Sequence, residues 1–195
     1  MRKIPFLPVC AAMLLTLPTF GAVESYEIDP AHSSVGFKIR HLMSKVPGKF
    51  NDFSGKLVLD PEKPEASSVE ATIQVKSIDT ANADRDKHLR AEDFFDVAKF
   101  PVMTFKSKKV VRTGPESADV TGDLTLRGVT REVTLKVQKT GQGKDPWGNI
   151  RTGWEATAVI NRLDYGVKYN KLVEGSNVLG DDVEISILIE AIQKK

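Results

Sequence analysis

Cysteine is almost absent from this sequence, whose 195 residues include only one, Cys10. It lies in an N-terminal segment that we expect to be removed, and Val9 before it is not the small residue that a lipid-attachment cysteine needs. The mature protein then contains no cysteine. Disulfides and cysteine nucleophiles are thereby excluded, and stability has to come from an ordinary hydrophobic core.

Long apolar runs are also lacking, apart from a short one near the N-terminus. Arg2 and Lys3 are followed by the apolar stretch Ile4–Leu17 and by the small residues Gly21 and Ala22, which is the pattern of a bacterial secretory signal. The stretch is too short and too rich in proline for a membrane-spanning helix. We expect cleavage after Gly21 or after Ala22, and the sequence leaves both bonds open.

Neither sign of charge is in excess, since 28 Lys and Arg stand against 26 Asp and Glu in the whole chain. Loss of residues 1–22 as a signal peptide removes two basic residues, so the mature chain is formally neutral. This balance predicts no nucleic-acid partner and no attraction of the whole chain to an anionic membrane. Residues 23–195 are long enough for one domain with a hydrophobic core of ordinary size. Because of the predicted secretory signal, we expect this domain in the periplasm.

The motifs of several common enzyme and metal sites are missing. There is no Gly-x-Ser-x-Gly elbow, and GQG at 141–143 leads to Lys-Asp-Pro instead of a helix, so we predict a turn there. His32 and His41 are nine positions apart, which in a strand puts them on opposite faces and roughly 30 Å apart. Each carboxylate near His88 has a basic neighbour. We therefore expect no metal and no cofactor.

The pattern that is present is alternation of apolar and polar residues. In SSVGFKIRH, for example, Val35, Phe37 and Ile39 alternate with residues such as Lys38. Eight strands that are apolar on one face only are predicted, at 33–41, 53–60, 68–77, 102–107, 118–128, 131–137, 153–162 and 181–191.

One-sided strands exclude a parallel sheet between helices and predict antiparallel pairing. The connections agree, because Gly128 marks a tight turn, 141–149 a wider one and 60–68 a long hairpin loop. Eight antiparallel strands with an apolar inner face close into a barrel or stack as a sandwich. We therefore expect an all-β fold. An eight-stranded barrel is wide enough for its own side chains or for one small ligand.

Whether such a barrel is filled depends on its inward side chains. The inward face mixes large with very small residues, which are Phe37, Phe105 and Trp154 with Gly36, Ala71, Gly122, Ala156 and Ala158. One interpretation is a filled core in which small and large side chains interdigitate. The other is an apolar tunnel, and composition alone does not separate the two.

Residues 82–95 do not follow the strand pattern. They contain no β-branched residue and carry charges of alternate sign, with Asp86 and Arg90 one helical turn apart. A short, broken helix is predicted, and its apolar side must cover an apolar surface, for which only the barrel is available. That side consists of Leu89, Phe94 and Phe95. The segment is then a helical cap on the rim of the barrel.

The charges of this cap allow three hypotheses. They form a solvated, salt-bridged face, or Arg85, His88 or Arg90 turns inward to meet the polar head of a ligand. The third hypothesis is a hydrolase in which Glu92 and Asp96, about one turn apart, act as paired carboxylates. Nothing in the local sequence adapts either carboxylate to acid catalysis, and we expect a protein that is not an enzyme.

Five blocks of the sequence resemble a known family. They are YEIDPAHSSVGFKIRHL, SIDTANADRDKHLRAEDFFDVAKFPVMTF, VTGDLTLRGVTREVTL, GQGKDPWGN and RLDYGV. Together they resemble the YceI-like family of secreted bacterial proteins, described as polyisoprenoid-binding and lipocalin-like, from about Tyr26 to Ala191.

The resemblance implies an extended, eight-stranded antiparallel, lipocalin-like barrel with a short helix in one connection. That connection contains Asp86, His88, Leu89 and Arg90. The resemblance also implies an elongated apolar pore that takes the tail of an isoprenoid lipid or a similar amphiphile, with the head near the mouth.

We therefore predict a periplasmic carrier that binds a long isoprenoid lipid, such as a quinone or a polyprenyl phosphate, by burying its tail. Arg85, His88 and Arg90 are the predicted head-group contacts. The predicted tunnel residues are Phe37, Ile39, Leu57, Ile73, Phe94, Phe95, Met103, Phe105, Leu126, Leu135, Trp154, Ile160 and Ile187.

Two alternatives come from other classes of protein. One is a filled barrel that acts in envelope stress or in protein interaction and binds no lipid, and the other is the lipid hydrolase. The sequence does not say which lipid is bound, which membrane protein donates or accepts it, or whether two barrels pair as a homodimer.

Overall fold

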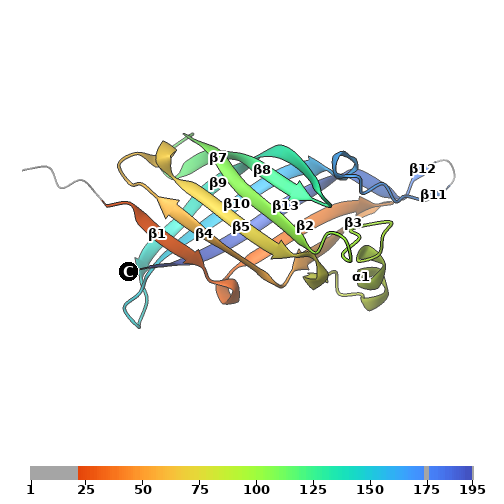
Figure 1. Ribbon diagram of the computed structural model, residues 1–195, viewed down its shortest axis with the longest axis horizontal. Helices are drawn as coiled ribbons and strands as arrows, with labels where there is room; N and C mark the ends of the chain where they lie inside the picture. The colour runs from red at the N-terminus through yellow and green to blue at the C-terminus, as the bar shows by residue number, and fades with distance from the viewer. Residues whose placement is uncertain (1–21, 174–175, 195) are drawn as a thin grey trace, which may run out of the picture.

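The computed structural model describes residues 22–173 and 176–194, which contain one α-helix and thirteen strands. Eleven of the strands belong to one sheet that closes into an elongated barrel, and β11 and β12 form a separate small sheet (Figure 1). The predicted signal peptide, except for Ala22, lies outside the described residues. The elements are β1 (Glu24–Ile28), β2 (Ser34–His41), β3 (Ser44–Phe50), β4 (Phe53–Leu59), β5 (Ser68–Gln74), β6 (Ile78–Asp79), α1 (Ala83–Leu89), β7 (Val102–Arg112), β8 (Ser117–Leu126), β9 (Val129–Lys144), β10 (Ile150–Asn161), β11 (Leu172–Val173), β12 (Ser176–Asn177) and β13 (Leu179–Gln193). No helix in this part of the chain is long and apolar enough to cross a membrane.

The barrel closes through β13 and β1. β13 pairs with β10, β1 pairs with both β13 and β4, and the ring runs β1-β4-β5-β7-β8-β9-β10-β13 and back to β1. All of these pairings are antiparallel. The eight-stranded antiparallel barrel with one short helix confirms the predicted fold class.

The two ends of the barrel differ. At the end that carries α1, which we call the α1 end, β13 pairs with β2 in place of β1, and β3 and β6 extend the sheet beyond β2. The other end, which we call the far end, holds the β9–β10 turn and the described C-terminus (Figure 1). The predicted helical cap is confirmed, because the connection between β6 and β7 contains α1 and lies at one end of the barrel (Figure 1).

Five of the observed strands were not predicted from the sequence, namely β1, β3, β6, β11 and β12. The last three are only two residues long. β1 is only five residues long, and β3 contains Pro47 and Gly48, which usually mark turns. Pro47 is tolerated because β6 pairs only with Lys49 and Phe50, so the backbone at Pro47 has a strand partner on one side, in β2. Proline is acceptable in a strand where no partner needs its missing N–H.

The predicted turn at 141–143 is wrong. Gly141 and Gly143 lie inside β9, where they pair with Gly153 and Arg151 of β10. The turn comes later, where the carboxylate of Asp145 accepts hydrogen bonds from the backbone N–H groups of residues 147 and 149. The tight turn at Gly128 is confirmed, with φ of 74° there and 50° at the residue before it, as a two-residue hairpin turn requires.

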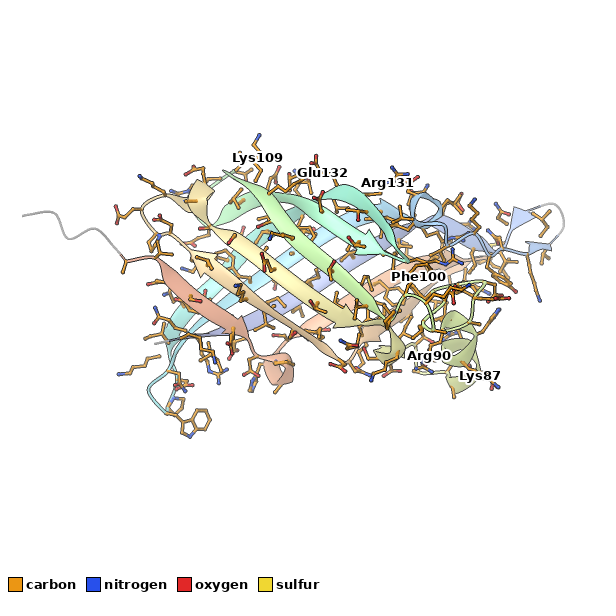
Figure 2. The ribbon with its side chains drawn as sticks, viewed as in Figure 1. Lys87, Arg90, Phe100, Lys109, Arg131 and Glu132 are labelled. Carbon is orange, nitrogen blue, oxygen red and sulfur yellow. The ribbon has the colours of Figure 1, made fainter. Side chains whose placement is uncertain are left out.

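The two faces of the strands separate apolar from charged side chains. On β8 the buried residues Val120, Leu124 and Leu126 alternate with polar residues. Outside, Lys108 of β7 forms ion pairs with Asp123 of β8 and Glu132 of β9. Figure 2 shows other charged side chains, such as Lys109 and Arg131, projecting from the same outer surface. The period of two therefore records an apolar inside and a solvated outside.

Arg151, at the start of β10, connects the segment between β1 and β2 to the barrel wall through ion pairs. Its Nη1 lies 2.7 Å from Asp29 Oδ2 and 2.5 Å from Glu190 Oε1, and its Nε lies 2.9 Å from Asp145 Oδ2. The hydrogen bond from Arg151, helped by one from His32, lowers the pKa of Asp29 from 3.8 to about 2. The same guanidinium holds the pKa of Asp145 well below its usual range.

This cluster predicts how stability depends on pH. A lowered carboxyl pKa contributes stability that is present above the unfolded value of 3.8 and lost as the pH falls toward the folded value of about 2. Arg151→Gln should be less stable than the wild type at neutral pH, and should lose less stability over that acid window. Urea unfolding at a series of pH values measures both effects.

The matched control is Lys136→Gln, which removes a partly exposed ion pair with Asp119 and should keep the acid dependence of the wild type. An Arg151→Gln variant that loses as much stability as the wild type on acidification would contradict the role of this cluster.

Candidate functional site: an apolar cavity inside the barrel

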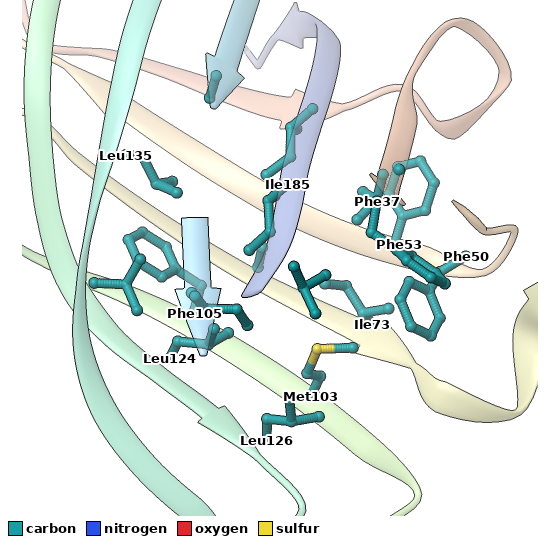
Figure 3. A pocket seen from close by; sticks show the side chains of 18 of the residues that line it. Phe37, Phe50, Phe53, Ile73, Met103, Phe105, Leu124, Leu126, Leu135 and Ile185 are labelled. Carbon is teal, nitrogen blue, oxygen red and sulfur yellow. The ribbon is translucent and has the colours of Figure 1, made fainter. Parts of the chain in front are cut away.

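The interior of the barrel is hollow. On β13, Val183, Ile185 and Ile187 point inward, yet they are only half-buried. An inward side chain keeps accessible surface only where it faces an internal space. That space is a cavity of about 390 Å³, which is within the usual range for sites of small molecules. Figure 3 shows side chains that converge on it from opposite walls, with Phe37 and Phe53 facing Leu135 and Phe105 across it.

Large side chains lie along the wall, which keeps the centre open. The ring of Phe105 covers Gly122 of the neighbouring strand so closely that a methyl group there would lie 2.6 Å from Phe105 Cζ. Phe37 covers Gly48, its register partner on β3, in the same way. Aromatic rings laid over glycines across a strand pair are a known device of curved sheets. The mixture of large and small inward residues thus agrees with the tunnel interpretation.

All thirteen residues predicted for the tunnel line this cavity. The prediction omitted further lining residues on the same alternating faces, among them Val35, Leu124, Val183, Ile185 and Ile189. Their signal was available, because each is two or four residues from a predicted tunnel residue on the same strand. Residues of β3 such as Phe50 were out of reach, since that strand was not predicted.

The cavity is elongated along the strands. β7 lines it from Met103 to Val110, and at about 3.3 Å per residue these positions are about 20 Å apart. At the far end the lining includes Ser67 of the β4–β5 connection and Ser68, the first residue of β5. A separate small cluster of buried side chains surrounds Tyr26 at this end. The hydroxyl group of Tyr26 donates a hydrogen bond of 2.7 Å to the carboxylate of Glu24.

The cap covers the α1 end of the cavity. Helix α1 begins at Asn82, whose side chain accepts a hydrogen bond of 2.9 Å from the N–H of Arg85. After the helix, the chain brings Leu89, Phe94 and Phe95 onto the cavity wall, as predicted. The Phe95 ring meets Phe50 edge to face, with 6.1 Å between centroids. The apolar side of the cap is therefore part of the site.

Asp86 and Arg90 are one helical turn apart, and the N–H of Arg90 donates to the carbonyl oxygen of Asp86, but their side chains have different partners. Asp86 is buried, and its carboxylate accepts hydrogen bonds from the N–H and the hydroxyl group of Thr80, at 2.9 and 2.5 Å. The guanidinium of Arg90 donates instead to the carbonyl oxygens of Lys76 and Ile78, both at 2.8 Å. Arg90 thus joins the cap to the backbone of residues 76–78, where it supplies donors for two carbonyl oxygens.

The three predicted head-group residues therefore separate. Arg85 and His88 line the cavity, whereas Arg90 does not. Arg85 donates from Nε to the hydroxyl oxygen of Thr80 at 2.7 Å. His88 lies 2.6 Å from Asp93, and its ring stands edge-on to that of Tyr169. Asp93 with His88 is one of two ion pairs within the described residues 82–101, so the salt-bridged face is smaller than expected.

Arg162, which the sequence did not suggest, is a further basic residue on the cavity wall. It is only 4% exposed. Its guanidinium donates to the carbonyl oxygens of Gly180, Val167 and Tyr169 and, at 3.2 Å, to Asp181. Burial lowers the pKa of this arginine from its ordinary value. A single arginine at the end of a strand gives no signal that it will be buried.

The polar groups of the cavity are unevenly placed. Arg85, His88 and Arg162 line it at the α1 end together with His41, whereas the middle is apolar. No carboxylate lines the cavity in the described part of the chain. Fixed positive charge without a lining carboxylate favours an anionic group or a hydrogen-bond acceptor at this end.

Two other clusters lie apart from the cavity. Glu92 and Asp96, the carboxylates of the hydrolase hypothesis, do not line it, and Asp96 lies 3.3 Å from Lys99 instead. Asp29, His32 and Glu190 bring ligand atoms within 4.8 Å of one another. Arg151 already forms ion pairs with both of these carboxylates, which neutralises the charge that a cation would need.

Comparison with known proteins gives a consistent result. Residues 26–191 match the family model of the YceI-like domain. A UPF0312 protein of Pseudomonas paraeruginosa is 42% identical over 191 residues, which are 94% of this chain and 97% of that protein.

Solved structures agree in fold. The YCEI protein of Campylobacter jejuni has a TM-score of 0.70 and 36% identity, over 86% of this chain and 96% of that one. A polyisoprenoid binding domain from Saccharophagus degradans has a TM-score of 0.63 over 87% of this chain and 98% of that one. At 18% identity, this second likeness concerns the fold alone.

The hollow interior predicts an asymmetry between two small-to-large substitutions. Ala71→Leu adds its side chain to the cavity, so the free energy of unfolding should change by less than about 1 kcal/mol. Gly122→Ala also adds an inward group, but against Phe105 and the backbone of β7, and should cost about 1–3 kcal/mol. Urea unfolding of both variants measures this difference. Equal losses in the two variants would indicate a filled core.

Proposed function

The chain belongs to the YceI-like family, and we propose that it is a periplasmic, non-catalytic carrier of a long isoprenoid lipid. The observation that carries this proposal is the shape and polarity of the cavity, which is elongated, apolar along its middle, and polar with basic groups at the α1 end. A molecule that matches it has a long apolar tail and one polar head. Isoprenoid quinones and polyprenyl phosphates have this form.

Burial of the tail supplies the binding free energy. Each methylene group removed from water contributes about 0.8 kcal/mol, so several isoprene units bind well without hydrogen bonds to the tail. Specificity for the tail is correspondingly weak, because smooth apolar walls discriminate poorly between chains of similar width. The polar end of the cavity is then the place where one head group is distinguished from another.

The head is assigned to the α1 end. Arg85 and His88 offer donors from the cap, and Arg162 places a fixed charge on the barrel wall. Among the two candidate lipids, a polyprenyl phosphate makes fuller use of these groups, since guanidinium and phosphate form strong charge-assisted hydrogen bonds. A quinone would use them as donors to its carbonyl oxygens.

Other observations support the proposal at a coarser level. The name of the Saccharophagus degradans domain says that it binds polyisoprenoids. The N-terminal sequence has the pattern of a secretory signal, which is the basis for proposing the periplasm. A carrier role rather than hydrolysis is proposed because no carboxylate lines the cavity in the described residues.

The carrier proposal predicts that the protein is purified with a lipid in its cavity. Native mass spectrometry of the mature protein from its own periplasm should show a stoichiometric added mass, and solvent extraction should release a quinone or a polyprenyl lipid. Ile185→Trp, which fills the middle of the cavity, should abolish the added mass. Leu188→Trp is the matched control, because Leu188 is 48% exposed on the outer face of the same strand.

A clean apo mass for the wild type that persists after addition of both lipids would overturn the carrier proposal. Added mass in the Ile185→Trp variant would instead place the ligand outside the cavity.

The head-group assignment predicts a difference between two ligands of equal tail length. The wild type should bind a polyprenyl phosphate more tightly than the corresponding polyprenol, and Arg85→Gln should reduce this preference about tenfold, the effect of losing a hydrogen bond to a charged group. The ratio of the two affinities is the readout, because general loosening of the cap affects both ligands alike. Arg131→Gln, on the outer surface (Figure 2), should leave the ratio unchanged. An unaltered ratio in Arg85→Gln would remove Arg85 from the head-group site.

A further inference from the structure

Four apolar side chains project into solvent at the α1 end. Leu42 and Met43 form the β2–β3 turn, and Leu172 and Val173 form β11; their exposed fractions are 41%, 100%, 70% and 50%. We call these four residues the apolar tip. Local folding does not explain the turn residues, because a two-residue hairpin turn favours Asn and Gly, and Leu42 has a φ of 49° that side chains rarely adopt.

The two parts of the apolar tip lie side by side. The N–H of Leu42 donates to the carbonyl oxygen of Val178 at 2.8 Å, and the N–H of Val178 donates to that of Lys171 at 3.0 Å. Leu172 pairs with Asn177 in the β11–β12 hairpin. This ladder joins the β2–β3 turn to the hairpin that carries Leu172, at the extreme of the barrel where β11 and β12 are labelled in Figure 1.

The apolar tip adjoins the polar end of the cavity. His41 and Leu179 are register partners on β2 and β13, and both line the cavity. Leu42 follows His41 directly in the chain. The last cavity-lining residue of β2 is thus followed directly by the first residue of the apolar tip.

Basic residues surround the apolar tip. Arg40, Lys45, Lys168 and Lys171 are exposed and lie within four residues of its members in the chain. Lys45 forms an ion pair with Glu184, and Asp182 is a nearby exposed acidic residue of β13. The chain as a whole has too little net charge to attract an anionic surface from a distance. Local lysines and arginines next to exposed apolar side chains nevertheless match the charge of a bilayer that contains anionic phospholipid.

The geometry points to a bilayer surface as the occupant, and we propose that the apolar tip inserts into the headgroup region of a membrane that contains anionic phospholipid. A stable protein interface buries about 800 Å² per partner, contributed by about 20–30 residues. Four side chains, on the β2–β3 turn and on β11, form a narrower projection than that. Single exposed apolar residues are common, and Trp147 at the far end is one, with 80% exposure; four together beside basic residues are not.

Flotation with vesicles tests this docking. The wild-type mature protein should float with vesicles of equal parts phosphatidylcholine and phosphatidylglycerol that contain no isoprenoid lipid. Met43→Ser combined with Leu172→Ser should weaken binding about tenfold or more, since two apolar side chains no longer leave water. Lys168→Gln combined with Lys171→Gln should remove the preference over vesicles of phosphatidylcholine alone. Trp147→Ser, at the far end, is the matched control and should float like the wild type.

Failure of docking is distinguishable from failure of the carrier proposal. The vesicles contain no cavity ligand, and Ile185→Trp, in which the cavity is filled, should float like the wild type. Docking is overturned if the wild type stays in solution, or if the Met43→Ser and Leu172→Ser variant floats equally well. If the wild type sediments as a dimer and this double variant sediments as a monomer, the apolar tip binds a second copy of the chain, and the proposal is also overturned.

Discussion

The structure depends on the pairing of β1 with β13, which turns an open sheet into a closed barrel. Tyr26 opposite Gln193 and Ile28 opposite Ala191 join the first strand to the last, so the described sheet needs no exposed edge along this seam. Closure with eight strands also sets the interior width, which is just sufficient for side chains or for one ligand. Every later property, including the cavity, its direction and its two unlike ends, follows from a ring of this size.

Within that ring, the placement of large side chains decides between a filled and a hollow interior. The rings of Phe37 and Phe105 pack over Gly48 and Gly122 on neighbouring strands. They therefore lie along the wall and do not cross the centre of the barrel. The half-buried Ile185 and its neighbours on β13 then face open space. A buried polar group without a partner is costly on an apolar wall, and the charged lining residues Arg85 and Arg162 lie at the α1 end, where backbone carbonyls and Thr80 accept their hydrogen bonds. The indole N–H of Trp154 is an exception, since it is buried on the cavity wall without a hydrogen-bond partner in the described residues.

Much of this arrangement was predictable from sequence, because alternation specifies both a strand and its inward face. The thirteen predicted tunnel residues all line the cavity for that reason. The prediction failed where a residue occupies an environment unusual for its type. Pro47, for example, lies in a strand because β3 has no strand partner on one side at that position. Arg90 and Arg162 look like surface charges in sequence, yet both satisfy backbone carbonyls that only the folded chain brings together.

The polar end of the cavity and the apolar tip share one end of the barrel, and this coincidence has a physical consequence. A long tail that crosses water between bilayer and cavity exposes methylene groups, each at a cost of about 0.8 kcal/mol, and that sum is the barrier to exchange. Contact between the α1 end and a membrane shortens the aqueous path. His41 and Leu179 line the cavity, and His41 directly precedes Leu42 of the apolar tip, so the polar end of the cavity lies next to the proposed point of contact. In the proposed carrier, lipid binding and lipid delivery are then separate properties: the width of the barrel sets the first, and the apolar tip at the α1 end sets the second.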